Sequence, residues 1–337
     1  MIFEKTQKRV LLILIISLVF VFLISLAIGQ SSFSIQDLID VLFGNSNNAM
    51  IFIITKIRLP RLLAASIGGA SLALSGLLLQ TLTKNPLADS GVLGINTGAG
   101  MIITLVITFS QIDSPKMIQW LPFLSAVGGC LTILFVYFMS RKKNHGMNPV
   151  RLIITGVGVS TLLSGLMVSL IGNVNQYKMD YIVNWLSGRI SGDDWQTLII
   201  ICPILLIFWL LSFSRSRFLN IMNLNDETAL ALGLDLQKER LILLILATIL
   251  SAISVILVGN ITFLGLVSGH ITRQILGNDH RITIPCSLMI GAMILLIADS
   301  LCRVLLVGTD IPTGILVSVI GAPYFIYLLT KMSVKST

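Results

Sequence analysis

The stretch SGLLLQTLTKNPLADSGVLGINTGA, from Ser75 to Ala99, decides the fold. It lies between two long apolar runs, yet it contains lysine, aspartate, asparagine, proline and four glycines. A lipid bilayer tolerates polar, non-helical backbone only where protein covers it or water reaches it. The stretch is therefore either a loop at one face of a membrane or part of a pathway through the membrane.

The composition of the whole chain is that of an integral membrane protein. Of its 337 residues, 55% are hydrophobic and 11% are charged, and the mean hydropathy is +0.94. A soluble domain carries about 25% charged residues. No segment is long and polar enough for a separate soluble domain. We therefore expect one transmembrane domain over residues 1–337, without a fused ATPase or catalytic domain.

Apolar windows of about 19 residues predict nine membrane spans. They cover residues 10–29, 58–80, 92–110, 118–140, 151–172, 196–214, 240–259, 282–307 and 312–330. The first run is longer than a signal-peptide core, so we interpret it as an uncleaved span. A shorter apolar piece near 262–276 brings the number of crossings to about ten. The predicted fold class is all-α, a polytopic membrane bundle of about ten helices.

The basic residues predict the orientation of this bundle. Most of the 23 lysines and arginines fall on the side of the two termini in this topology. Cytoplasmic loops carry such an excess, so we expect both termini in the cytoplasm and residues 84–89 at the inner face. The net charge of +8 is then a membrane feature and does not indicate nucleic-acid binding. Several basic residues remain on the outer side, and the rule for cytoplasmic loops does not explain them.

Two of these outer arginines open the second span in the sequence RLPR, from Arg58 to Arg61. Pro60 suits the start of a helix. Positions 58 and 61 are three apart, so both guanidinium groups can point the same way. They either snorkel to the membrane interface or bind carboxylates of an external partner.

Asp299 and Arg303 lie four residues apart in an otherwise apolar span. They form either an intrahelical ion pair, worth about 0.3–0.5 kcal/mol at a surface, or a functional pair. Ionisable groups inside a span usually face the bundle interior and serve function.

The longest polar segment on the inner side runs from residue 215 to residue 240. Asn225 is a suitable N-cap for a short helix, with Asp226 and Glu227 in its first turn. Gly233 fits the position that ends such a helix. The helix is either an interfacial connector or a knob for a cytosolic partner.

A second glycine-rich break, Asn260 to Gly269, resembles the break from Asn85 to Gly94. Interrupted spans in corresponding parts of two halves point to the pathway in transporter folds. We also expect a kink near Pro323 in the last span.

Motifs for chemistry are missing from the sequence. It has no phosphate-binding loop of the P-loop type and no H-E-x-x-H motif. Neither the histidines nor the cysteines have metal-ligand spacing, so we expect no metal site and interpret the cysteines as core residues. These residues are His145, His270, His280, Cys130, Cys202, Cys286 and Cys302.

Together the motifs resemble one family closely, the FecCD-type permeases of ABC importers for iron–siderophores, haem and cobalamin. The resemblance extends from Arg58 to the end of the last span. It rests on the blocks RLPR (58–61), GASLALSG…Q…NPLADSGVLG…GA (69–99), RLIITGV (151–157), NWLSGRISGDDW (184–195), LNDETALALGL (224–234), GNITFLGLVSGHITR (259–273), GNDHR (277–281), AD…R (298–303) and DIPTGILVSVIGAPYF (310–325).

This resemblance implies a type II ABC importer permease fold in a bacterial cytoplasmic membrane. It implies a second permease subunit, identical or homologous, and a central pathway lined chiefly by the fifth and tenth spans. Two cytosolic ATPase subunits, which use ATP and Mg²⁺, would bind on the inner side. A substrate-binding protein would dock on the outer side. The chain itself would bind no cofactor and catalyse no reaction.

The resemblance also implies roles for particular residues. Arg58, Arg61 and Arg303 match positions that meet acidic residues of the binding protein. Asn85, Pro86 and Leu87 match positions near the inner gate. The ATPase-coupling helix corresponds to Asn225, Asp226, Glu227, Ala231, Leu232, Gly233 and Leu234. Ser90 and Gly269 stand where the family usually has proline, which puts the local backbone geometry there in doubt.

The function that follows is ATP-driven import of a ferric siderophore by alternating access, with iron–hydroxamate as the first expectation. Haem, cobalamin and catechol siderophores are the alternatives within the family. An ion-coupled secondary transporter is the alternative from another class. It would need acidic ion sites inside the membrane, and Asp299 is the candidate.

Overall fold

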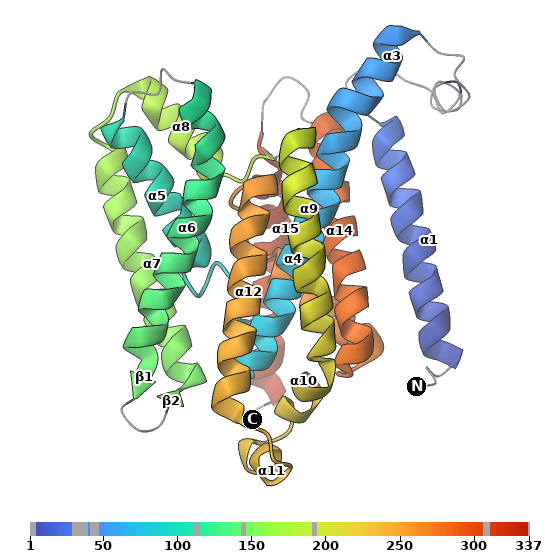
Figure 1. Ribbon diagram of the computed structural model, residues 1–337, viewed down its shortest axis with the longest axis vertical. Helices are drawn as coiled ribbons and strands as arrows, with labels where there is room; N and C mark the ends of the chain where they lie inside the picture. Colours follow the sequence, from blue (N-terminus) through green and yellow to red (C-terminus); the bar gives the residue numbers. More distant parts are fainter. Residues whose placement is uncertain are drawn as a thin grey trace.

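The computed structural model describes residues 5–28, 40, 47–110, 115–142, 146–190, 194–305 and 311–335. These residues form a bundle of helices that stand side by side (Figure 1). The first half contains α1 (Lys5–Ala27), α3 (Asn48–Phe52), the π-helix η1 (Ile53–Arg58), α4 (Leu59–Thr83), α5 (Ile95–Phe109), α6 (Pro115–Ser140), the two-residue strands β1 (Arg141–Lys142) and β2 (Gly146–Met147), and α7 (Pro149–Ile171). The second half contains α8 (Gln176–Leu186), α9 (Trp195–Ser214), α10 (Ser216–Met222), α11 (Asp226–Ala231), α12 (Leu236–Val258), α13 (Leu264–Leu276), α14 (His280–Leu305) and α15 (Thr313–Lys335).

The prediction of a bundle of about ten apolar helices is confirmed. In the described part of the chain, 8 helices are long and apolar enough to cross a membrane. The remaining two expected segments are α5, with 15 residues, and α13, with 13 residues. At 1.5 Å per residue these are roughly 20 Å long, whereas the hydrocarbon core is about 30 Å thick. The expectation of a full span over 92–110 was therefore wrong in length.

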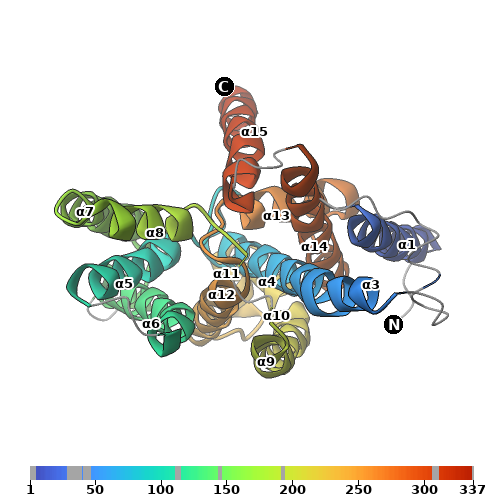
Figure 2. The same ribbon diagram turned by 90° about the horizontal axis from the view of Figure 1, so that it is seen from above.

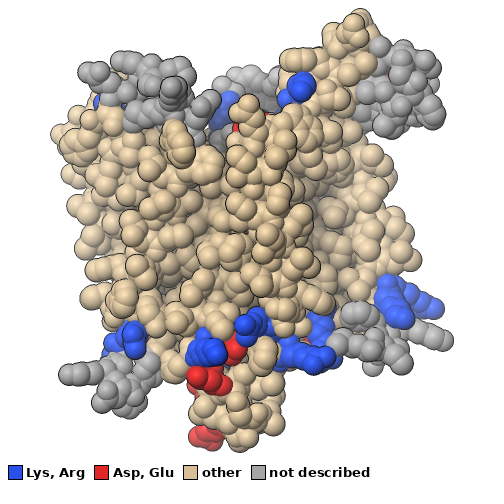
Figure 3. Space-filling view, in the orientation of Figure 1, with Lys and Arg blue, Asp and Glu red and all other residues tan. Residues whose placement is uncertain are grey.

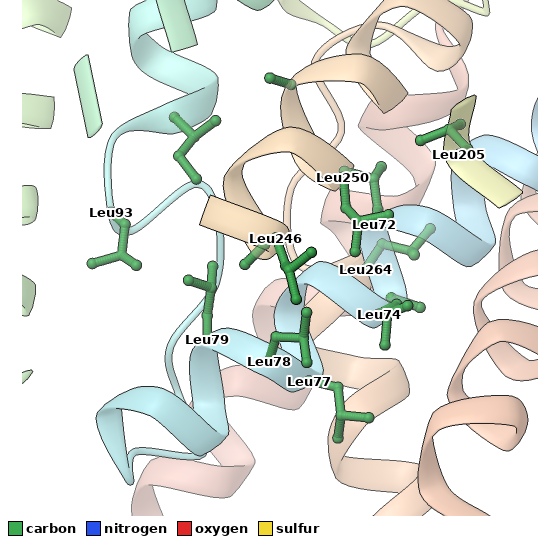
Figure 4. Close-up of a cluster of buried hydrophobic side chains, with 14 of the residues drawn as sticks. Leu72, Leu74, Leu77, Leu78, Leu79, Leu93, Leu205, Leu246, Leu250 and Leu264 are labelled. Carbon is green, nitrogen blue, oxygen red and sulfur yellow. The ribbon is translucent and has the colours of Figure 1, made fainter. Parts of the chain in front are cut away.

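Helix α4 is the centre of the bundle (Figure 2). It is buried along almost its whole length and packs against α12, α13 and α14. Its leucines meet leucines of α9, α12 and α13 in the main hydrophobic core (Figure 4). The alternation of small and large residues in the sequence of α4 explains this position, because small residues let neighbouring backbones approach closely.

The glycines of α4 make these close approaches. A Cβ atom added to Gly69 would lie 2.8 Å from the carbonyl oxygen of Gly291 in α14. A Cβ atom on Gly76 would collide with the backbone of Gly265 in α13. Both positions therefore require glycine.

The beginning of α1 and the end of α15 lie at the same end of the bundle as α11 (Figure 1). We call this the α11 end, and the opposite end the α3 end. On the face drawn in Figure 3, lysine and arginine side chains gather at the α11 end, and a broad band without charge separates them from those at the α3 end. This is the distribution that the sequence predicts for an even number of crossings.

Candidate functional site

The outer arginines gather around one buried carboxylate at the α3 end. Asp299 in α14 has no exposed surface. One of its oxygens, Oδ1, accepts hydrogen bonds from Nε and Nη2 of Arg61 at 3.0 and 2.9 Å. Its other oxygen accepts a hydrogen bond from Nε of Arg303 at 2.9 Å. The predicted Asp299–Arg303 pair is thus present, and it also joins α14 to α4 through Arg61.

Arg58, at the same end of the bundle, binds the end of α1. Arg58 is 6% exposed and donates from Nη1 to the carbonyl oxygens of Leu26 and Ala27 at the end of α1. Arg303 also donates to the carbonyl oxygens of Ser25 in α1 and of Ile28, the residue after α1. The cluster ties α1, α4 and α14 together.

At the opposite end, α4 ends in a strained residue. Lys84 has φ +52°, in the left-handed region where glycine is usual at the end of a helix. The backbone N–H of Asn85 donates to the carbonyl of Gln80, and the side chain of Asn85 accepts from the N–H of Leu87 at 2.9 Å. Asn85, Pro86 and Leu87 are half-buried. These contacts give the predicted gate residues a defined turn.

Beyond this turn the chain returns into the bundle and meets the second break. Asp89 is 4% exposed, and its Oδ2 accepts the backbone N–H of Phe263 at 3.1 Å, directly before α13 begins. Asn96 donates to the carbonyl of Ile261 at 2.9 Å. The two interrupted spans are therefore in contact. Asp89 binds the beginning of α13, and the whole length of α13 separates it from the α11 end. Asp89 therefore lies deep in the bundle, and its expected position at the inner face was wrong.

Ser90 and Gly269, the two positions where the family usually has proline, both lie in this region. The backbone N–H of Ser90 interacts with the Asp89 carboxylate, an interaction that a proline could not make. A Cβ atom on Gly269 would lie 2.7 Å from the side-chain oxygen of Gln80 in α4. Gly269 is inside α13, and the second break is shorter than expected, from Gly259 to Phe263.

The short helix expected near Asn225 is α11. The side chain of Asn225 accepts the N–H of Thr228 at 3.0 Å, which is an N-cap. Gly233 has φ +81°, and the N–H of Leu234 donates to the carbonyl of Ala229 at 3.1 Å, which closes the helix. Leu230 and Leu232 are 57% and 60% exposed. The helix therefore presents an apolar tip to its surroundings.

A chain of ion pairs joins α11 to the turn after α4. Nζ of Lys84 donates to the carbonyl of Leu224 at 2.6 Å and to Oδ1 of Asp226 at 2.7 Å. Arg240 in α12 donates to Oδ2 of Asp226 at 2.7 Å. Partial burial of Asp226 opposes its ionisation. The hydrogen bonds from Lys84 and Arg240 outweigh that effect and hold the pKa of Asp226 below its usual range.

The sequence motifs do not reveal these ion pairs, because Lys84 and Asp226 are 142 positions apart. One signal was available: an exposed lysine directly before a predicted gate and an acidic residue in a predicted coupling helix. Asp89 was also missed as a contact residue, although a carboxylate between two glycine-rich breaks could have drawn attention to it.

The histidines and cysteines that the sequence singled out have ordinary neighbours. His280 is buried and its ring nitrogens contact the Thr81 hydroxyl at 2.8 Å and the Asn220 side chain at 3.0 Å. His270 lies edge-on to the Tyr324 ring. His145 lies outside the described residues.

The expectation of four core cysteines holds only in part. Cys286 and Cys302 are buried, whereas Cys130 is exposed and Cys202 is half-buried. Pro323, where we expect a kink, lies inside α15, and the helix continues past it to Lys335.

Comparison with known proteins gives consistent matches over nearly the whole chain. The model of the FecCD transport family matches residues 17–331. The iron(3+)-hydroxamate import system permease protein FhuG of Bacillus subtilis is 36% identical, over 97% of this chain and 98% of the relative. The hemin transport system permease protein HmuU of Yersinia pestis is 34% identical, over 97% of each chain.

A solved structure also matches this chain over nearly its whole length. It is an ABC transporter of the metal-chelate type in an inward-facing conformation, with a TM-score of 0.82 and 30% sequence identity. The match covers 96% of this chain and 99% of that chain.

Proposed function

Because the chain belongs to the FecCD transport family, we propose that it is the permease subunit of an ATP-binding-cassette importer that carries a ferric siderophore into the cell. Iron–hydroxamate is the first candidate, supported by the relative FhuG at 36% identity. Haem and ferric citrate relatives are 34% and 36% identical. Haem, cobalamin and catechol siderophores, the alternatives that the sequence resemblance implies, are to be tested beside hydroxamates.

The chain is a multi-pass membrane protein. We place it in a bacterial cytoplasmic membrane, with the α11 end and both termini in the cytoplasm. The gathering of lysine and arginine at that end supports this orientation (Figure 3).

The α11 end carries the observation on which the mechanism rests. The apolar tip of α11 suits insertion into a cleft of a cytosolic ATPase, and Lys84 bonds α11 directly to the turn at Asn85–Leu87. In this account, ATP binding and hydrolysis displace α11. The Lys84–Asp226 contact then transmits the displacement to the gate turn, and the pathway opens alternately to each side.

The fifth and tenth spans are α7 and α15, and both have surface that a second permease subunit could cover. In their apolar windows 17% and 28% of residues are buried, against 83% for the segment that contains α4. Gly158 and Gly165 of α7 have nothing within 4 Å of a Cβ position. Surfaces of this kind are available to an identical or homologous partner chain.

At the α3 end, we assign Arg61 and Arg303 to the docking of an extracytoplasmic binding protein. Their side chains are 27% and 14% exposed, and acidic side chains bind arginine in bidentate geometry. Arg58 would support them through its bonds to α1. The chain contributes a pathway, docking and coupling, while the partner ATPases use ATP and Mg²⁺.

Replacing Asn225–Gly233 by a flexible glycine–serine linker tests the coupling assignment. We expect the ATPase subunits to co-purify with the variant at a much lower yield, because the apolar tip is lost. The control replaces Gln176–Leu186, the α8 helix at the α3 end, by a glycine–serine linker of 11 residues, the length of α8. If the ATPase co-purifies with the α11 variant at full yield, the assignment is wrong.

A further inference from the structure

An apolar groove lies between α6 and α12 on the outside of the bundle. Its volume is about 510 Å³. Its walls are aliphatic side chains of both helices, with Tyr137 of α6 and Leu241 of α12 nearest the α11 end. Ala126 of α6 lines it farther toward the α3 end. The groove lies within the apolar band, so acyl chains are the surrounding solvent.

The end of this groove at α11 is basic on both sides. The Arg141 guanidinium lies over the Tyr137 ring, 5.8 Å from its centre. Lys238 is exposed and precedes Leu241 by three positions, so it lies on the groove face of α12, one turn beyond the lining. The two basic residues are held at neighbouring positions, because Met147 pairs with Arg141 and its N–H donates to Gln237 at 2.8 Å.

The nearby acidic groups leave this basic pair largely uncompensated. Glu239 is paired with Arg215, and Asp226 is paired with Lys84 and Arg240. Asp235 is the exposed acid on the same turn, and its side chain accepts the backbone N–H of Lys238 as the N-cap of α12. Lys142 adds a further basic residue to the sequence at the end of α6.

We propose that this groove binds one anionic phospholipid, with an acyl chain along α6 and α12 and its phosphate between Arg141 and Lys238. A basic site between transmembrane helices next to an apolar groove has the chemistry that anionic headgroups recognise. The tyrosine at the junction suits the level of the headgroup, where aromatic side chains are favoured. The bound lipid would brace α6 against α12, which contacts α11 through Arg240 and Asp226.

The experiment measures lipids retained by the purified full-length permease with its partner subunits. The protein is exchanged into micelles that contain equal amounts of phosphatidylglycerol and phosphatidylcholine, and native mass spectrometry counts the bound lipids. The variants are Arg141→Gln with Lys238→Gln, which removes the basic pair, and Ala126→Phe, which fills the groove. The matched control is Arg9→Gln with Arg217→Gln, which removes two exposed basic residues away from the groove.

We expect the wild type and the control to retain phosphatidylglycerol in preference to phosphatidylcholine. In the basic-pair variant the ratio of bound phosphatidylglycerol to bound phosphatidylcholine should fall by about 30-fold. This corresponds to about 2 kcal/mol, at about 1.4 kcal/mol per tenfold, and is the effect expected for two surface charges. Ala126→Phe should reduce retention of both lipids. An unchanged preference in the basic-pair variant, or an equal loss in the control, would overturn the site. Since lipid retention is measured without transport, this result is independent of the proposed substrate.

Discussion

Removing the Lys84 side-chain amine should uncouple ATP hydrolysis from transport while the fold remains intact. Lys84 and Asp226 are 34% and 48% exposed, so solvent screening limits their ion pair to about 0.2–1 kcal/mol. A loss of 1 kcal/mol changes a conformational equilibrium by about fivefold. We therefore expect Lys84→Met to raise the ATP hydrolysed per chelate transported by up to about fivefold.

A second substitution at the same position separates coupling from stability. Lys84→Gly also removes the amine, but glycine relieves the strain of φ +52°, roughly 1–2 kcal/mol. This variant should be at least as stable as the wild type and should be uncoupled as strongly as Lys84→Met. Lys84→Arg should restore part of the coupling, since it can still bind Asp226.

The assay is a reconstituted importer in proteoliposomes, with ATP consumption and chelate uptake measured in the same sample. The matched control is Lys178→Met, because Nζ of Lys178 also donates to two carbonyl oxygens, at the α3 end. If Lys84→Met and Lys84→Gly keep the wild-type ratio of ATP to chelate, the transmission through Lys84 is refuted.

Three further predictions concern other charged groups. Asp299→Asn should destabilise the permease by about 3 kcal/mol, because it removes the charge of a buried carboxylate shared by Arg61 and Arg303; an unchanged thermal unfolding temperature in detergent would contradict this. Arg61→Gln should weaken docking of the binding protein several-fold in surface plasmon resonance, and equal affinity would exclude Arg61 from the docking surface. The pKa of Asp226 is lowered, so its carboxylate stays mostly charged even at about pH 3.9, the usual pKa of an aspartate. The contact with Lys84 stabilises the fold above that value and is lost only as pH falls through the lowered pKa, so the ATP-to-chelate ratio should be constant between about pH 8 and pH 5.

The sequence predicts the local features of the fold correctly. The N-cap at Asn225 and the helix end at Gly233 depend on a few neighbouring residues, so the residue types alone indicate them. The ten apolar segments follow from hydropathy in the same way. The short length of α5 does not, because apolar residues continue on both sides of Gly94 and conceal the point where the helix begins.

The contacts of the candidate site depend on residues far apart in the sequence. Asp299 has an apparent partner four residues away, Arg303, and this conceals its second partner Arg61, 238 positions earlier. The Lys84–Asp226 contact and the burial of Asp89 likewise require the packing of α4 against α12 and α13. A pattern within one segment does not contain this information.

Uptake by the reconstituted importer tests the central claim most directly. The permease, its partner permease, the ATPase and the binding protein are placed in proteoliposomes, and radiolabelled ferric hydroxamate is supplied with ATP or with a proton gradient alone. The account predicts accumulation that requires ATP and the ATPase subunits. Accumulation that persists without the ATPase and collapses with the proton gradient would contradict it and would favour an ion-coupled transporter.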